Sequence, residues 1–166
     1  MSMYSSSVPI AVHFLNNLSK ILKKGEAFAQ EKGIEETVLT SARLAPDMFP
    51  LTSQVQIACD VAKGCGARLS GTESPKHEDT ETTFDELQAR IQKTITFLES
   101  LSPESIDGSE AKEIQFKAGP YELEFTGESF LNTFSLPNLY FHVTTAYNIL
   151  RHNGVNIGKM DYLGGE

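Results

Sequence analysis

Four segments of the chain repeat their apolar residues at helical spacing, and this pattern constrains the fold more than any other feature. In each segment the apolar residues recur every three or four positions, so they form one stripe along a helix. Such a stripe must be buried against other helices. Four of them predict a mainly α fold, a four-helix bundle in a single domain over residues 1–166. The segments are 8–32, 51–69, 84–101 and 136–152.

Start and stop signals bound these helices. Pro9 suits a first helical turn, where its missing N–H has no partner, and Gly33 suits the left-handed position after a C-terminus. Thr83 and Glu86 have the spacing of a capping box. A shorter helical turn is expected over residues 35–43. The loops are long enough for either up-down-up-down or crossed connections between the helices.

The apolar period changes to two between the third and the last helix. Ile114 and Phe116, and then Leu123 and Phe125, alternate with polar residues on either side of the turn residues 118–120. This pattern predicts a β-hairpin inserted before the last helix. A lone hairpin is not stable in water, so Phe116 and Phe125 are expected to be largely buried against the helices.

Two further segments have weaker patterns. Residues 72–82 are polar and contain Pro75, which predicts a solvated loop with His77 exposed. Residues 128–134 are expected to form a short helix.

Charge and hydropathy exclude several classes of partner. The chain has 14 basic and 22 acidic residues, and its formal charge of −8 argues against nucleic acid or an anionic membrane surface. No apolar run reaches the roughly 18 residues of a membrane span. The N-terminal segment lacks the basic residues of a signal peptide. We therefore expect a cytoplasmic protein without a nucleic-acid or membrane partner.

The second helix carries both cysteines and a row of small residues. The spacing of Cys59 and Cys65 is not that of a zinc site, so we expect buried, reduced thiols that are poor nucleophiles. Ala58, Ala62 and Gly66 allow a neighbouring helix to approach closely. This close contact is expected either inside one bundle or between two copies of the chain.

No short catalytic motif is present, so the candidate site depends on the last helix. The chain has no phosphate-binding loop, no dinucleotide-binding glycine pattern and no zinc-protease motif. Asn138 and His142 are four positions apart and therefore neighbours on the flank of the apolar stripe. Three interpretations of His142 are open: a buried histidine bonded to a carbonyl or carboxylate, a metal ligand or acid–base group, or a hydrogen-bond partner of a ligand.

Five segments carry a family resemblance: Leu44–Gln56, Asp60–Lys63, Thr82–Ile91, Pro137–Gly154 and Gly158–Leu163. They resemble the signature segments of a domain-of-unknown-function family, numbered nineteen-ninety-three, in the DinB/YfiT-like superfamily. The resemblance implies a four-helix bundle that is often a dimer. It does not imply a known reaction.

The superfamily resemblance also implies a site for a divalent metal, held by three histidines. One comes from the second helix and two come from the last helix, four positions apart. His142 matches one of these positions, but its partner position is Asn138, and residues 51–69 contain no histidine. Asp60 lies opposite the apolar stripe and is not expected to replace a ligand. We therefore predict no cofactor, with a divalent metal at His142 as the alternative.

These features favour a metal-free module that binds a small molecule or a partner. Its pocket is expected between the second and last helices, lined by Asn138, His142 and Tyr147. The alternative is an enzyme, either metal-dependent or using His142 as a general base. A third possibility is a structural or dimerisation domain without a pocket. A homodimer is expected from the resemblance.

Overall fold

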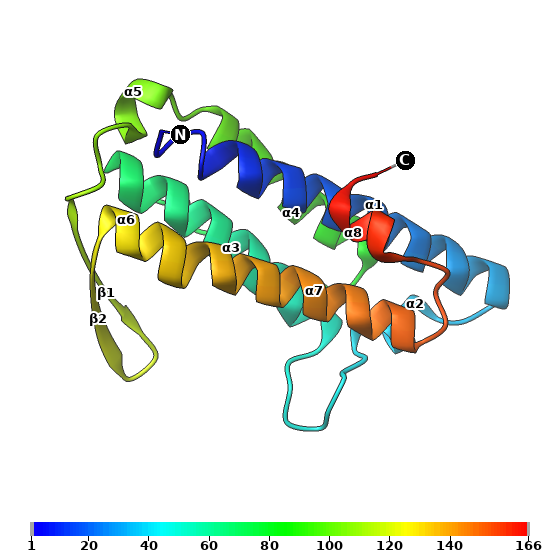
Figure 1. Ribbon diagram of the computed structural model, residues 1–166. Coiled ribbons are helices and arrows are strands. Elements are labelled where there is room, and N and C mark those ends of the chain that lie inside the picture. Colours follow the sequence, from blue (N-terminus) through cyan, green and yellow to red (C-terminus); the bar gives the residue numbers. More distant parts are fainter. Residues whose placement is uncertain (1, 166) are drawn as a thin grey trace.

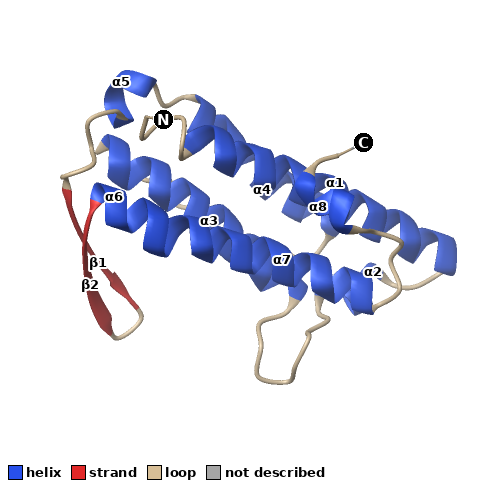
Figure 2. Cartoon of the chain, in the orientation of Figure 1, coloured by secondary structure: helices blue, strands red, loops and turns tan. Residues whose placement is uncertain are grey.

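The computed structural model describes residues 2–165 and consists of four long helices with a hairpin at one end (Figures 1 and 2). The predicted mainly α bundle with a β-hairpin before the last helix is confirmed. The long helices are α1 (Val8–Lys32), α3 (Leu51–Ser70), α4 (Phe84–Glu99) and α7 (Leu136–His152). The shorter elements are α2 (Glu36–Thr40), α5 (Pro103–Ile106), β1 (Glu113–Ala118), β2 (Tyr121–Thr126), α6 (Gly127–Ser129), the π-helix η1 (Phe130–Ser135) and α8 (Lys159–Leu163).

The connection between α3 and α4 is a crossed one, so the bundle is not up-down-up-down. Asp60 on α3 lies beside Arg90 on α4, and further along both helices Gly66 lies beside Leu98. Residue numbers therefore rise in the same direction on both helices, which makes α3 and α4 parallel. α1 and α7 run the opposite way (Figure 1). The segment 71–83 must return along the length of the bundle to join the end of α3 to the start of α4.

Several of the predicted helix boundaries are confirmed by their backbone geometry. Gly33 follows α1 with a φ of 62°, in the left-handed region that favours glycine. Thr83 accepts a hydrogen bond from the backbone N–H of Glu86, and the Glu86 carboxylate accepts from the Thr83 N–H, which completes the capping box. These local signals therefore place the ends of α1 and α4.

The row of small residues on α3 serves packing inside the bundle. Ala58, Ala62 and Gly66 are all buried. A Cβ atom on Gly66 would lie 2.6 Å from Leu101 Cδ1 and 3.0 Å from Leu98 Cδ2. The close contact is therefore made with the end of α4, and this row does not supply a surface for a second copy of the chain.

The hairpin pairs β1 and β2 as the alternating pattern predicts, but it is less buried than expected. Phe116 pairs with Leu123, and Ile114 pairs with Phe125. Ile114 is buried, whereas Phe116 and Phe125 are only half-buried, so the expectation of largely buried rings is wrong. The hairpin extends beyond the end of the helices (Figure 1), so both rings pack mainly on aromatic residues of the short π-helix η1, and Phe116 also contacts Arg68 of α3.

Four short elements differ from the expected pattern. The expected helix over 128–134 is divided into α6 and η1, and η1 runs directly into α7. α5 and α8 are too short to show a helical period in the sequence. α8 is held against α1 by a hydrogen bond from Asn17 Nδ2 to the carbonyl oxygen of Tyr162 at 3.0 Å. None of the helices within residues 2–165 is long and apolar enough to cross a membrane.

Candidate functional site

His142 lies on α7 and faces α3, where it is hydrogen-bonded to a glutamine. Its Nδ1 is 2.7 Å from Gln54 Oε1, and Gln54 Nε2 donates to the carbonyl oxygen of Phe49 at 3.0 Å. Because that carbonyl only accepts, Gln54 presents its oxygen to the histidine, and Nδ1 must carry the proton. Burial lowers the pKa of His142, so the ring is neutral at pH 7. Of the three interpretations, the structure shows a buried histidine bonded to a carbonyl oxygen.

The three residues predicted to line one pocket are not brought together. Asn138 is half-buried one turn before His142 on α7. Tyr147 follows His142 by five positions, which places it about 140° further round the helix. Its ring packs against Tyr162 of α8, with 6.5 Å between the ring centroids. His142 and Tyr147 therefore face different neighbours.

The donor set around His142 does not fit the three-histidine metal site that the resemblance implies. The group that faces His142 from α3 is the neutral amide of Gln54, and the histidine nitrogen on that side carries a proton. Asp60 binds Lys63 and Arg90 instead. In the part of the chain that the structure describes, no three His, Cys, Asp or Glu side chains are grouped to hold one ion. No chemical step is therefore assigned to a metal.

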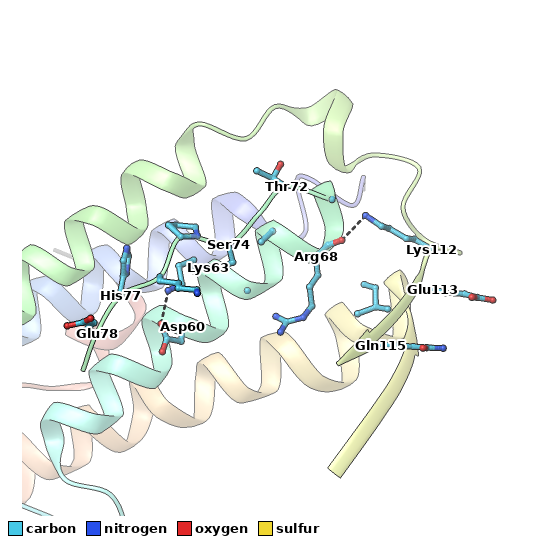
Figure 3. A pocket seen from close by; sticks show the side chains of 16 residues that line it. Asp60, Lys63, Arg68, Thr72, Ser74, His77, Glu78, Lys112, Glu113 and Gln115 are labelled. Carbon is cyan, nitrogen blue, oxygen red and sulfur yellow. Dashed lines mark hydrogen bonds and ion pairs between the residues drawn. The ribbon is translucent and has the colours of Figure 1, made fainter. Parts of the chain in front are cut away.

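A large open cleft lies on another side of α3 (Figure 3). Its volume is about 860 Å³, and its walls are the second half of α3, the segment 71–78 and the start of β1. Both signs of charge line it. The cations are Lys63, Arg68, Lys76 and Lys112, and the carboxylates are Asp60, Glu78 and Glu113.

Arg68 is a half-buried cation of this cleft with neither a carboxylate nor a carbonyl partner within residues 2–165. Its Cζ lies 4.2 Å from the centroid of the Phe116 ring and 5.9 Å from that of Phe130, so the guanidinium stacks on the aromatic cluster under the hairpin. Among residues 2–165 its guanidinium makes no ion pair. Burial lowers the pKa of Arg68, which remains charged because an arginine pKa starts above 12.

A glycine makes room for this arginine. Gly64 lies one turn before Arg68 on α3, and a Cβ atom there would collide with Arg68 Nη1. Glycine inside a helix costs about 1 kcal/mol relative to alanine, so its presence in the middle of α3 is itself a signal. A glycine four positions before an arginine inside a predicted helix could therefore have indicated the cleft from the sequence. Helical periodicity does not reveal this pair, because both residues lie outside the apolar stripe.

The other two cations near the floor of the cleft already have partners. Lys63 is only 6% exposed and pairs with Asp60 at 3.0 Å. Lys112 Nζ donates to the carbonyl oxygens of Arg68 at 2.8 Å and Leu69 at 3.2 Å, at the C-terminal end of α3. A lysine in this position satisfies carbonyl groups that have no partner within the helix.

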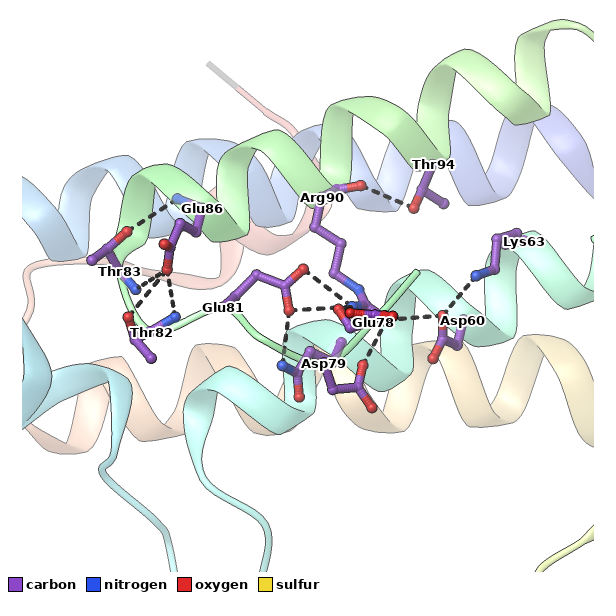
Figure 4. Close-up of polar contacts among 11 residues, drawn as sticks. Asp60, Lys63, Glu78, Asp79, Glu81, Thr82, Thr83, Glu86, Arg90 and Thr94 are labelled. Carbon is purple, nitrogen blue, oxygen red and sulfur yellow. Dashed lines mark hydrogen bonds and ion pairs between the residues drawn. The ribbon is translucent and has the colours of Figure 1, made fainter. Parts of the chain in front are cut away.

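A second arginine anchors the loop that forms one wall of the cleft (Figure 4). Arg90 is 2% exposed and pairs with Asp60 at 3.0 Å, Asp79 at 3.0 Å and Glu81 at 3.1 Å. It also donates to the carbonyl oxygen of Glu78 at 3.1 Å. The predicted solvated loop is therefore tied to α4 by its own carboxylates, although its side chains remain largely exposed.

His77 lies in this loop and lines the cleft. It was expected to be exposed, and this is wrong: the side chain is half-buried, and its Nδ1 is buried without a hydrogen-bond partner among residues 2–165. Burial lowers the pKa of His77, and the nearby charges of Lys63 and Arg90 lower it further. His77 is therefore a neutral ring beside the positive groups of the cleft.

The cysteines carry no chemistry at this site. Cys59 and Cys65 are free and buried on α3, as predicted. Burial raises the pKa of Cys59 to about 12 and that of Cys65 to about 11. Because the thiolate is the nucleophile and the metal ligand, both side chains are unreactive near neutral pH.

The fold defines the class of this protein as a DinB-like helical bundle, in which four long helices carry a hairpin before the last one. A crystal structure of a DinB family member protein from Shewanella denitrificans is similar to this chain, with a TM-score of 0.89 and 46% sequence identity. The match covers 98% of this chain and 92% of that one. The family described as a domain of unknown function (DUF1993) matches residues 3–163, and the chain belongs to this family. No curated protein matches it.

Proposed function

We propose that this protein is a metal-independent module that binds a small molecule in the cleft between α3, the segment 71–78 and β1. The cleft itself carries the proposal, because its volume of about 860 Å³ lies in the range of small-molecule sites, roughly 300–1,000 Å³. Polar groups from three separate elements converge on it, as in sites that orient a ligand. His77 adds a buried ring nitrogen without a partner in the described chain.

The proposal moves the site away from the pocket first expected between α3 and α7. There, His142 Nδ1, Gln54 and the carbonyl oxygen of Phe49 form a continuous hydrogen-bond chain, so a ligand would have to compete with existing bonds at every group except the ring Nε2. In the cleft, Arg68 makes no side-chain hydrogen bond within residues 2–165, and His77 Nδ1 is buried without one. A ligand gains more free energy where it meets an unsatisfied buried group than where it must break existing hydrogen bonds.

The test is a thermal-shift and calorimetric screen of the full chain with a library of neutral and charged small metabolites. Gly64→Leu would fill the floor of the cleft, while Ala89→Leu, at an exposed position on α4, is the matched control. We expect binders whose affinity falls at least tenfold in Gly64→Leu and is unchanged in Ala89→Leu. Binders that are insensitive to Gly64→Leu would place the site elsewhere and reject the proposal.

One observation favours the alternative function, an enzyme with His142 as general base. The hydrogen bond to Gln54 holds Nδ1 as the donor, which leaves Nε2 as a basic nitrogen without a partner among residues 2–165. A base oriented by a second group is the usual arrangement for proton abstraction. The screen addresses this alternative as well: turnover of any bound compound that disappears in His142→Gln would favour the enzyme, and binding without turnover would favour the module.

A further inference from the structure

We propose that Arg68 is the anchor of the cleft and binds the carboxylate or phosphate group of an anionic ligand. The inference rests on the proposed binding function and names the chemical class of its ligand. Three residues form the anchor: Arg68 on α3 supplies the guanidinium, Phe116 on β1 contacts it, and Gly64 leaves room for it.

Arg68 has no counter-ion within residues 2–165. Arg68 is half-buried, and among residues 2–165 no carboxylate lies within ion-pair distance of it. A charge that has lost part of its water without gaining a partner is unfavourable, and an incoming anion would remove that penalty. Of the three carboxylates that line the cleft, Asp60 is engaged by Lys63 and Arg90. The side chain of Glu113 points away from the cleft, and Glu78 lies at the end of the cleft away from Arg68 (Figure 3).

The position of the guanidinium suits an anion. It lies over the Phe116 ring at 4.2 Å from its centroid, with Phe130 at 5.9 Å, and its Nη1 lies against Gly64, so contacts with three elements restrict its movement. No acceptor within residues 2–165 is hydrogen-bonded to its N–H groups, and a guanidinium is a planar fork of donors that matches the two oxygens of a carboxylate or phosphate. Restricting the arginine before a ligand arrives reduces the entropy lost on binding.

The charge of the surroundings also matters. Lys112 donates to the backbone carbonyl oxygen of Arg68 at 2.8 Å, so a second cation lines the same cleft at the C-terminal end of α3. The protein as a whole carries a formal charge of −8, so long-range attraction does not bring anions to this surface. An anion at Arg68 must therefore be held by short-range contacts.

The test is a titration of the full chain with inorganic phosphate and, separately, with acetate at constant ionic strength. The Nε–Hε signals of Arg68 and of the exposed Arg151 are followed by ¹H–¹⁵N NMR. We expect a saturable shift of the Arg68 signal with at least one of the two anions. A response to phosphate alone indicates a phosphate ligand, and a response to acetate alone indicates a carboxylate.

The variants separate specific binding from general attraction of anions. Arg68→Met should weaken binding at least tenfold, Arg68→Lys should weaken it less, and Arg151→Met should leave it unchanged. Circular dichroism confirms that each variant is folded, and Phe116→Leu offers a second route, because it removes the stacking surface but retains the charge. The inference is overturned if the Arg68 signal shifts no earlier in the titration than that of Arg151, or if anion binding survives in Arg68→Met.

The two levels of the proposal fail in different ways. A neutral ligand whose binding is lost in Gly64→Leu but kept in Arg68→Met would leave the cleft as the binding site and reject Arg68 as its anchor. Binding that survives both substitutions would reject the cleft as well.

Discussion

Arg68 lines the cleft that the segment 71–78 helps to form, and Arg90 binds the same segment further along, but the surroundings of the two arginines differ in almost every respect. Arg90 is 2% exposed and is bound by three carboxylates and a backbone carbonyl. Arg68 is half-buried, stacks on aromatic rings and has no carboxylate partner within residues 2–165. Both side chains extend from long helices of the same bundle, so the helix alone does not explain the difference.

The difference comes from what the crossed connection carries. The segment 71–83 passes over Arg90 and delivers Asp79 and Glu81 to it. At its start the same segment lines the cleft with Gly71, Thr72, Ser74 and Pro75, which carry no charge, whereas Glu73 is not part of the lining. A buried arginine with its carboxylates holds a structure together, whereas one that lacks them is a site where a ligand anion can bind. We therefore expect Arg90 to contribute to stability, and the proposal gives Arg68 a role in binding.

The largest expected effect tests the structural half of this comparison. Arg90→Met should lower the free energy of unfolding by about 3 kcal/mol, because it leaves Glu81 and its neighbouring carboxylates without their common cation. Urea denaturation followed by circular dichroism measures this change. The matched variant Arg68→Met should lower the free energy of unfolding by no more than about 1 kcal/mol, since it loses the contact with the Phe116 ring but no ion pair. Equal losses in the two variants would contradict the division of roles.

The hydrogen-bonded pair His142 and Gln54 should also stabilise the bundle, but by less than the ion pairs of Arg90. His142→Ala removes the partner of Gln54 and should lower the free energy of unfolding by about 1–3 kcal/mol. Because burial lowers the pKa of His142, the unfolded chain binds that proton more tightly than the folded one. Stability is therefore complete above pH 6.5 and falls as the pH drops from 6.5 towards the folded-state pKa.

Two measurements serve as controls for this prediction: the pH dependence of the free energy of unfolding and the metal content of the purified protein. Denaturation at several pH values should show a flatter stability profile in His142→Ala than in the natural sequence between pH 5 and 7. Protein purified without chelator should carry well under one equivalent of zinc, nickel, iron or manganese by elemental analysis. Stoichiometric metal that disappears in His142→Ala would instead support a metal-dependent enzyme.

His77 reports on the charge of the cleft. Its pKa should lie below 6.5, because burial and the charges of Lys63 and Arg90 disfavour the imidazolium form. An anion at Arg68 should raise this pKa, since a negative charge nearby favours the protonated ring. NMR titration of the His77 ring with and without phosphate measures both values. A pKa above 6.5 in the free protein would show that the carboxylates, not the cations, dominate the cleft.

The smallest expected effect concerns self-association. We expect a homodimer on sedimentation at micromolar concentration, as the family resemblance suggests. If the cleft is a ligand site, it stays open in that dimer, and Arg68→Met should leave the sedimentation coefficient unchanged. A sedimentation coefficient of a monomer would contradict the expected homodimer. A dimer that dissociates in Arg68→Met would mean that the unpaired arginine serves the interface.

The elements that could be predicted from the sequence are those governed by local rules. The four apolar stripes correspond to α1, α3, α4 and α7, and the alternation of Ile114 and Phe116 corresponds to β1. The capping box at Thr83 and the glycine at position 33 also form as predicted. Each of these depends on side chains within a few positions of one another, so the spacing along the chain contains the necessary information.

The candidate site was only partly predictable for a related reason. The sequence places His142 on the flank of the apolar stripe of the last helix, and the side chain is buried in the structure. Its partner Gln54 lies 88 positions away on α3 and has no distinguishing pattern of its own. The sequence predicts an exposed His77 and gives no signal for Arg68 from helical periodicity, because a histidine in a polar loop and a charged residue on a helix are usually solvated.

The sequence by itself determined that this chain forms four amphipathic helices with a hairpin before the last, because apolar periodicity and capping act over a few residues. Only the tertiary structure decided that α3 and α4 run parallel, since the loop between them is long enough for either direction. That choice places Asp79 and Glu81 on Arg90 and leaves Arg68 without a carboxylate. Contacts between distant segments determine which charges are neutralised, and they are fixed only when the helices pack.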